Sequence, residues 1–396
     1  MKFDNKIISR LAAFGFFILL AVLCVLTLRH ADETYSFFEN RNLTRKPVAE
    51  SETTLSGEYF TDLERYLVDR AAWRSDLVKL DTRLSLAICR PVVNEVVVLD
   101  DKLLPFNAYD GEIDKADIAY RAAAEAQILA AHRDAAEAYG GHFCYVAVPC
   151  QYVCLEDEYP WYLENHAALT KASSGALFAA LDARGVEYID MYEAYRAFPD
   201  DKKAQFTSTI DNHYSIFGAY ETYLRMTSWI NAADTGAVPV LAEDEMRVEK
   251  IESHYLGSRN RKLFDLWQND EALYCIYPTA DVPLRRSDGG EEVEPGVYAL
   301  PAEGDVATYS LYMGGDLAQT TVDTGRADLP SVLIYGDSFT NAVECVAWYS
   351  FGRMDTFDLR HYKDKPLDEL IAELKPDYVF CIRDYESLLD LTNNGQ

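Results

Sequence analysis

Two short segments carry the residue types that serine-based acyl chemistry requires. Ser338 ends the sequence Gly336-Asp337-Ser338, directly after the apolar run 331–335, and His213 follows Asp211 by two positions. A serine hydroxyl becomes a nucleophile when an imidazole takes its proton, and a carboxylate then holds that imidazole in the right tautomer. The two segments therefore supply a candidate nucleophile, base and orienting carboxylate.

Each segment also has a purely structural interpretation. Ser338 and Ser215 suit helix N-caps, and Gly336 and Asp211 suit turns. In a parallel sheet, however, ligands bind where strands end and helices begin, and free N–H groups at a helix start stabilise an oxyanion. Together, the segments support one shared site as well as they support two unrelated turns.

The elements expected around these segments alternate between strand and helix after residue 112. We expect strands at 142–148, 186–190, 331–335, 354–359 and 377–382, and helices at 113–139, 174–184, 215–230, 341–351 and 367–374. Short apolar strands that alternate with helices predict a parallel sheet covered on both faces. Upstream we expect one helix over 59–86 and a hairpin over 92–104, broken by Asp100-Asp101.

The N-terminus indicates a membrane anchor. Residues 11–28 carry no charge, and Lys2, Lys6 and Arg10 precede them. At about 1.5 Å per residue this run is long enough to cross a bilayer, and the preceding basic residues keep the N-terminus in the cytoplasm. We expect a single-pass cell-membrane protein with an extracytoplasmic domain, with a cleaved signal peptide as the alternative.

The amino-acid composition argues against several classes of binding partner. The 396 residues include 37 Lys and Arg against 65 Asp and Glu, a net charge of −28. Phosphate binding requires clustered basic residues, which argues against nucleic acid. No Cys and His spacing suits zinc, and we expect neither a metal nor a cofactor.

An ordered set of motifs resembles the DHHW family, which belongs to the SGNH-hydrolase-like group that includes alginate O-acetylation proteins. The motifs are Glu39-Asn40-Arg41, Val148-Pro149, Asp211-Asn212-His213-Tyr214, Gly336-Asp337-Ser338 and Asp358-Leu359-Arg360. The resemblance implies an SGNH-like α/β three-layer sandwich with a parallel sheet and a circularly permuted motif order. Asn212 and Tyr214 depart from the family pattern, which has His and Trp there.

The resemblance also implies a chemistry. Ser338 matches the nucleophile, His213 the base and Asp211 its carboxylate. The implied activity is an O-acyltransferase, of the O-acetyl kind, or an esterase acting on cell-surface polysaccharide. A multi-spanning membrane O-acyltransferase is the implied source of acyl groups. The alternative is a non-catalytic polysaccharide- or wall-binding scaffold with the same fold.

Three further residues are candidates for binding substrate or completing an oxyanion hole: Arg360, Asn341 and Tyr214. Arg360 matches a family arginine, and Asn341 follows Ser338 by three positions. A surface arginine and a packed asparagine are the structural alternatives.

These expectations divide the chain into five parts. They are the cytoplasmic N-terminus and anchor (1–30), a helical and hairpin region (31–110), the first half of the SGNH-like domain (111–235), a turn-rich β insertion (236–329) and the second half (330–396).

Overall fold

The computed structural model describes residues 5–30, 33–39, 41–106, 112–232 and 237–392. Lys2 of the basic N-terminus and Asn40 of the first motif lie outside these ranges. The chain divides into two compact units, one of residues 1–98 with 260–268 and one of residues 99–259 with 269–396.

The larger unit is built on an eight-stranded sheet in the order β11-β10-β12-β14-β13-β15-β6-β7. Its strands are β6 (His142–Val148), β7 (Tyr188–Asp190), β10 (Arg285–Asp288), β11 (Glu291–Val293), β12 (Gln319–Asp323), β13 (Ser331–Gly336), β14 (Arg353–Asp358) and β15 (Tyr378–Asp384). The last five strands in the sheet order run parallel. The near-continuous burial of β6, β13 and β15 is typical of strands covered on both faces.

The sheet differs from the expected parallel sheet at one edge. Strands β12, β10 and β11 pair antiparallel beside β14. They come from the turn-rich range 236–329, so part of that range extends the central sheet. Sequence periodicity could not reveal this, because the pairing joins segments that are distant in the chain.

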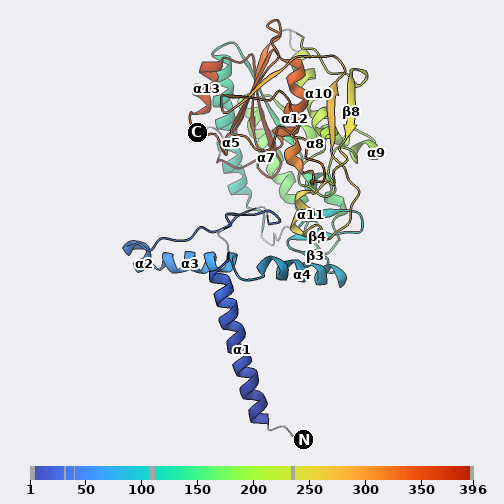
Figure 1. The fold of residues 1–396 in the computed structure, drawn as a ribbon. Helices are drawn as coiled ribbons and strands as arrows, with labels where there is room; N and C mark the ends of the chain where they lie inside the picture. Colours follow the sequence, from blue (N-terminus) through green and yellow to red (C-terminus); the bar gives the residue numbers. More distant parts are fainter. Residues whose placement is uncertain (1–4, 31–32, 40, 107–111, 233–236, 393–396) are drawn as a thin grey trace. The chain divides into compact units, whose positions relative to one another are not determined.

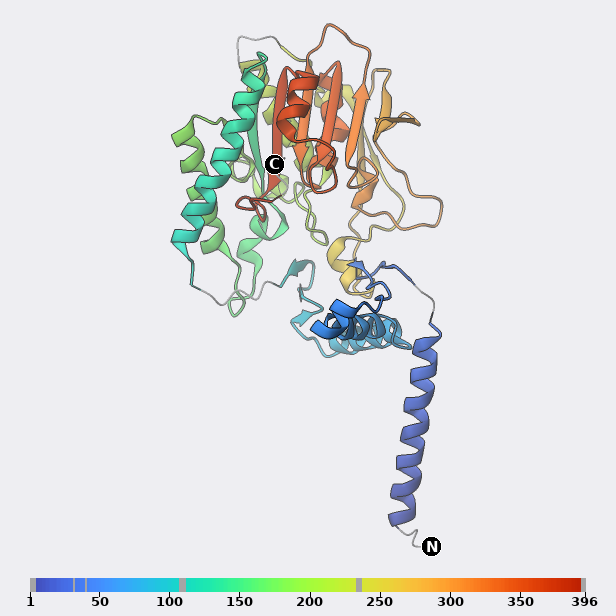
Figure 2. The same cartoon turned by 90° about the vertical axis from the view of Figure 1, so that its left-hand side faces the viewer.

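Helices cover both faces of the sheet and make three layers (Figures 1 and 2). On one face α5 (Lys115–Glu137) packs against α7 (Ala167–Arg184) and α13 (Leu367–Leu374). On the other, α10 (Ile216–Ala232) packs against α12 (Thr340–Ala347). This arrangement confirms the expected α/β class.

The helix boundaries follow local capping. The Asp114 carboxylate accepts the N–H groups of Ala116 and Asp117 at the start of α5, and Gly185 ends α7 with φ +64°. Helix α7 begins seven residues before the expected position, because the side-chain oxygen of Asn165 accepts the N–H of Ala167 at 3.1 Å.

The smaller unit contains α1 (Asn5–Leu28), α2 (Ser51–Ser56), α3 (Glu58–Asp69), α4 (Arg74–Ala87) and the hairpin strands β3 (Val92–Val93) and β4 (Val96–Val98). Within α1, the 20 residues Ser9–Leu28 are long and apolar enough to cross a membrane. The chain turns at Asp100-Asp101 as expected, where the N–H of Leu99 donates to the carbonyl of Lys102 at 3.0 Å. An additional turn joins β3 and β4 at Asn94-Glu95, both with positive φ. Positive φ at both positions is typical of two-residue hairpin turns.

The single helix expected over 59–86 is wrong, because the chain breaks between α3 and α4. Asp69 accepts hydrogen bonds from Arg41 and from the N–H of Thr44, at 2.6 and 2.8 Å. Arg70 donates to the carbonyls of Thr44 and Glu33, both at 2.8 Å. These distant contacts bend the helix where no Gly or Pro marks a break.

The remaining elements are short. They are β1 (Tyr35–Ser36), β2 (Arg41–Asn42), β5 (Leu103–Pro105), α6 (Gln151–Cys154), α8 (Met191–Arg196), α9 (Asp200–Lys203), β8 (Met246–Lys250), α11 (Ser258–Lys262) and β9 (Tyr274–Pro278).

A stability prediction follows from the end of β13. A Cβ added to Gly336 would lie 1.8 Å from the carbonyl oxygen of Ile382 on β15, its register partner. We expect Gly336→Ala to lower the free energy of unfolding by more than about 3 kcal/mol, because backbone atoms of two central strands must separate. Urea unfolding measures this loss.

Gly175→Ala is the matched control, since a Cβ there meets nothing within 4 Å in the middle of α7. It should raise the unfolding free energy by about 0.5–1 kcal/mol. Equal urea midpoints for Gly336→Ala and the parent would contradict the packing described.

Candidate active site

The candidate nucleophile lies where a central strand turns into a helix. β13 ends at Gly336, Ser338 follows after one residue, and α12 begins at Thr340. The Asp337 carboxylate fixes this turn, because its two oxygens accept the N–H groups of Phe339 and Asp384, each at 3.0 Å. The carboxyl end of the strand thus presents the Ser338 hydroxyl at a fixed position.

Ser338, His213 and Asp211 form one hydrogen-bonded chain. Nε2 of His213 lies 2.7 Å from Oγ of Ser338, and Nδ1 of His213 lies 2.6 Å from Oδ1 of Asp211. Both distances are those of good hydrogen bonds. The structure therefore brings together two segments that are 125 residues apart in the chain.

The surroundings of Asp211 keep its carboxylate charged. It is only 2% exposed, and burial alone would raise its pKa. The interaction with His213 and the N–H groups of Ser258 and His213 outweigh burial, and together they hold the pKa of Asp211 well below its usual range. A charged Asp211 accepts a hydrogen bond from the N–H at Nδ1 of His213. Nε2 then carries no proton and is free to accept the proton of Ser338.

Other residues hold the imidazole in place. The ring of Tyr309 stacks on His213 with centroids 3.7 Å apart and planes 3° apart, and Phe339 lies 4.9 Å away at a tilt. Oδ2 of Asp211 accepts the N–H of Ser258 at 2.6 Å. Sequence reasoning missed Tyr309 and Ser258, because each contacts the site across a long sequence separation and neither stands in a recognisable motif.

Tyr214 supports the backbone next to Ser338. It is 1% exposed, and its hydroxyl donates to the carbonyl of Phe339. Burial raises the pKa of Tyr214 well above its usual value, so the phenol stays neutral. Its hydroxyl is engaged inside the protein, which suits a positioning residue.

Asn341 and Arg360 are joined through an acidic residue. The side-chain amide of Asn341 donates to Asp316 at 3.0 Å, and the Arg360 guanidinium contacts both Asp316 at 3.0 Å and Asp358 at 2.6 Å. Among the described residues, neither side chain is hydrogen bonded to the side chains of Ser338, His213 or Asp211, although the backbone N–H of Asn341 donates to the carbonyl of Ser338 at 3.3 Å.

One backbone donor at the turn is available to a ligand. Within the described residues, the N–H of Ser338 has no hydrogen-bond acceptor, whereas the next two N–H groups both bond to Asp337. A free N–H on the nucleophile itself is the kind of donor that stabilises an oxyanion.

The free energy of unfolding is expected to depend on pH through the carboxyl group of Asp384, whose backbone N–H donates to Asp337. Ser387 Oγ lies within hydrogen-bond distance of both Asp337 and Asp384, at 3.0 and 2.9 Å. Burial and the negative charge of Asp337 raise the pKa of Asp384 well above its usual value. A carboxyl group that is protonated when folded and ionised when unfolded lowers the free energy of unfolding as the pH rises above about 3.9.

The amide of Asp384→Asn cannot ionise. The fall in the free energy of unfolding with rising pH, at most about 1.4 kcal/mol per pH unit, should therefore disappear in this variant. We expect the variant to be more stable than the parent at pH 7, as measured by urea unfolding at pH 5, 6 and 7. Asp281→Asn, at an exposed position, is the control. A variant with the same pH slope as the parent would exclude the assigned role of Asp384.

The layer order, the parallel core of the sheet and the serine after β13 define an SGNH-like α/β fold. Solved structures of that fold include PatB1 of Bacillus cereus, in one case with a sulfonyl adduct, and a DHHW family protein of Eubacterium siraeum. The expected resemblance to DHHW and SGNH-like proteins is confirmed at the level of the fold.

The similarity extends over nearly the full length of those proteins. The PatB1 structure with the adduct has 16% identity and a TM-score of 0.63, and it covers 76% of this chain and 98% of its own. The DHHW protein has 19% identity and a TM-score of 0.57, and it covers 76% of this chain and 94% of its own. No protein-family model and no curated protein sequence matches the chain.

Proposed function

We propose that this chain is a membrane-anchored, extracytoplasmic O-acyltransferase or esterase that acts on cell-surface polysaccharide through an acyl-serine. The observation that supports the proposal most is the hydrogen-bonded chain from Asp211 through His213 to Ser338. The family resemblance of the motifs adds the substrate class, and the preferred acyl group is acetyl.

The proposed reaction has two halves. In the first, His213 Nε2 takes the proton of Ser338 while Oγ attacks the carbonyl carbon of an acyl donor. The Ser338 N–H donates to the oxyanion, and His213 then returns the proton to the leaving oxygen as the acyl-serine forms. In the second half, His213 deprotonates a sugar hydroxyl or water, which attacks the acyl carbon. The bond between the acyl carbon and Ser338 Oγ then breaks, and His213 returns the proton to Oγ.

The proposed location rests on α1. Its apolar stretch Ser9–Leu28 spans 20 residues, or about 30 Å, which matches a bilayer core. Basic residues before it favour a cytoplasmic N-terminus, and this sends the larger unit outside. The acyl group then has to cross the membrane to reach Ser338. We propose that a multi-spanning membrane O-acyltransferase is the partner that supplies it.

The test is acyl transfer by the full chain in detergent. An aryl acetate serves as donor and a soluble oligosaccharide as acceptor, and mass spectrometry measures the acetylated oligosaccharide and free acetate. We expect acetyl transfer or hydrolysis well above the rate of Ser338→Ala. Equal rates for both proteins, with the oligosaccharide still bound, would favour the scaffold alternative.

A chemical probe follows from one of the solved structures. PatB1 carries a sulfonyl adduct in that structure. By analogy, we propose that a sulfonyl fluoride reacts with Ser338, with fluoride as leaving group and His213 as base. The probe reports the nucleophile without any knowledge of the natural acyl donor.

A further inference from the structure

Helix α4 exposes three of its four leucines, and its two buried residues are polar. Five apolar side chains, each at least half exposed, run along α4 and its two flanking residues: Trp73, Leu77, Leu80, Leu84 and Ile88. Their spacing of three or four residues places them on one face of the helix. The buried residues of α4 are Thr82 and Ser85. We call the five exposed residues the α4 stripe.

The polar face of α4 is held by the hairpin segment. Asn94, in the turn between β3 and β4, donates to Thr82 Oγ1 at 2.8 Å, and Arg90 donates to Ser85 at 3.3 Å. Because these bonds fix the rotation of α4, the stripe points away from the hairpin. A helix of a water-soluble domain shows the opposite pattern, and a contiguous exposed apolar face marks an interaction surface.

The α4 stripe begins where the apolar helix α1 ends. The N–H of Ala72 donates to Thr27 Oγ1 at 3.1 Å, which ties the start of α4 to the last turn of α1. Figure 1 shows helices α3 and α4 running across that end of α1.

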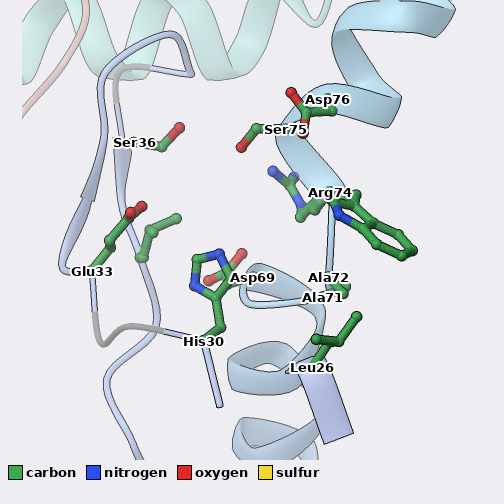
Figure 3. Close-up of a pocket in the computed structure, with 12 residues that line it drawn as sticks. Leu26, His30, Glu33, Ser36, Asp69, Ala71, Ala72, Arg74, Ser75 and Asp76 are labelled. Atoms are coloured by element: carbon green, nitrogen blue, oxygen red, sulfur yellow. The ribbon is translucent and has the colours of Figure 1, made fainter. Parts of the chain in front are cut away.

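A polar cavity lies between the end of α1 and the start of α4. Leu26 of α1 and Trp73 of the stripe line a cavity of about 270 Å³ together with charged residues that include Glu33, Asp69 and Arg74 (Figure 3). Charged groups at the end of a membrane-spanning helix belong to the headgroup region, where tryptophan is also enriched.

The charge of α4 also suits a lipid surface. The helix carries three basic and two acidic residues, whereas the whole chain has a net charge of −28. Anionic headgroups repel most of this acidic protein, but they attract α4, because its basic residues outnumber its acidic ones.

We infer that α4 lies in the membrane interface, with the stripe immersed among lipid headgroups and the upper acyl chains. An amphipathic helix of this kind binds with its apolar face a few ångströms below the headgroups. The inference rests on the proposed insertion of α1 in the membrane and is independent of the acyl chemistry. It gives the chain a second lipid contact next to its anchor.

The test uses the full chain reconstituted in vesicles of phosphatidylcholine and phosphatidylglycerol, with bromine on the upper acyl chains as a fluorescence quencher. We expect quenching of tryptophan fluorescence in the parent and at least a two-fold smaller quenched intensity in Trp73→Phe. Trp161→Phe, which removes a 94% exposed tryptophan of the larger unit, should leave the quenched intensity unchanged.

A second variant addresses the rest of the stripe. Leu77→Glu combined with Leu84→Glu should halve the quenching of Trp73, while Leu300→Glu, at another exposed leucine, should not. Vesicle flotation reports α1 insertion separately. A chain that floats with the vesicles while Trp73 stays unquenched would overturn the inference and leave the anchor intact. Crosslinking of two chains through Leu77→Cys without quenching would assign the stripe to a second copy.

Discussion

Ser338→Ala is expected to reduce acyl transfer to the uncatalysed background, a loss of at least about 10⁴-fold in kcat/KM. In the proposed reaction, the hydroxyl oxygen of Ser338 forms the covalent bond to the acyl group, and no neighbouring group can replace it. The measurement is release of the phenol from an aryl acetate, followed by the full chain in detergent.

The variant should keep its fold, because the one side-chain hydrogen bond of Ser338 in the described structure is to His213. Ser287→Ala, the same substitution in β10 of the same sheet, is the matched control and should retain parental activity. Circular dichroism and urea unfolding verify that both variants are folded. An active Ser338→Ala protein would refute the proposed nucleophile.

Asp211→Asn is expected to have the second-largest effect, a loss of about 10⁴-fold in kcat. In the parent, one carboxylate oxygen accepts from His213 Nδ1 and the other from the N–H of Ser258. An amide has a single acceptor oxygen, and if it bonds to Ser258 its NH₂ group faces Nδ1. The imidazole then carries its proton on Nε2 and cannot accept the proton of Ser338.

The kinetic pattern separates this role from a structural one. We expect kcat to fall with little change in KM, since Asp211 acts through His213 and has no contact with substrate in the proposed mechanism. Asp316→Asn is the control, at a carboxylate that contacts Asn341 and Arg360 and not His213. There we expect a change in KM larger than the change in kcat. Parental kcat in Asp211→Asn would contradict the assigned role.

Much of the larger unit could be predicted from sequence because its signals are local. The run 142–148 is a strand with the expected ends, and α13 covers the expected 367–374. Continuous apolar runs and cap residues specify such elements within a few positions. The order of the motifs along the chain then predicted that Ser338 and His213 meet, which the 2.7 Å contact bears out as geometry.

Features that depend on distant partners could not be predicted. The break between α3 and α4 arises from contacts of Asp69 and Arg70 with the segment 33–44. The stacking of Tyr309 on His213 likewise joins residues that nothing in the local sequence connects. The antiparallel edge of the sheet is a third case, because β12 finds β14 only in the folded protein.

The most direct measurement is the site of covalent modification by a sulfonyl fluoride. The full chain is treated with the reagent, digested, and mapped by peptide mass spectrometry, alongside His213→Ala. We expect stoichiometric modification at Ser338 in the parent and a rate at least about 10²-fold lower in His213→Ala, because the imidazole acts as the base. Modification spread over surface tyrosines and lysines, with Ser338 untouched, would contradict this expectation.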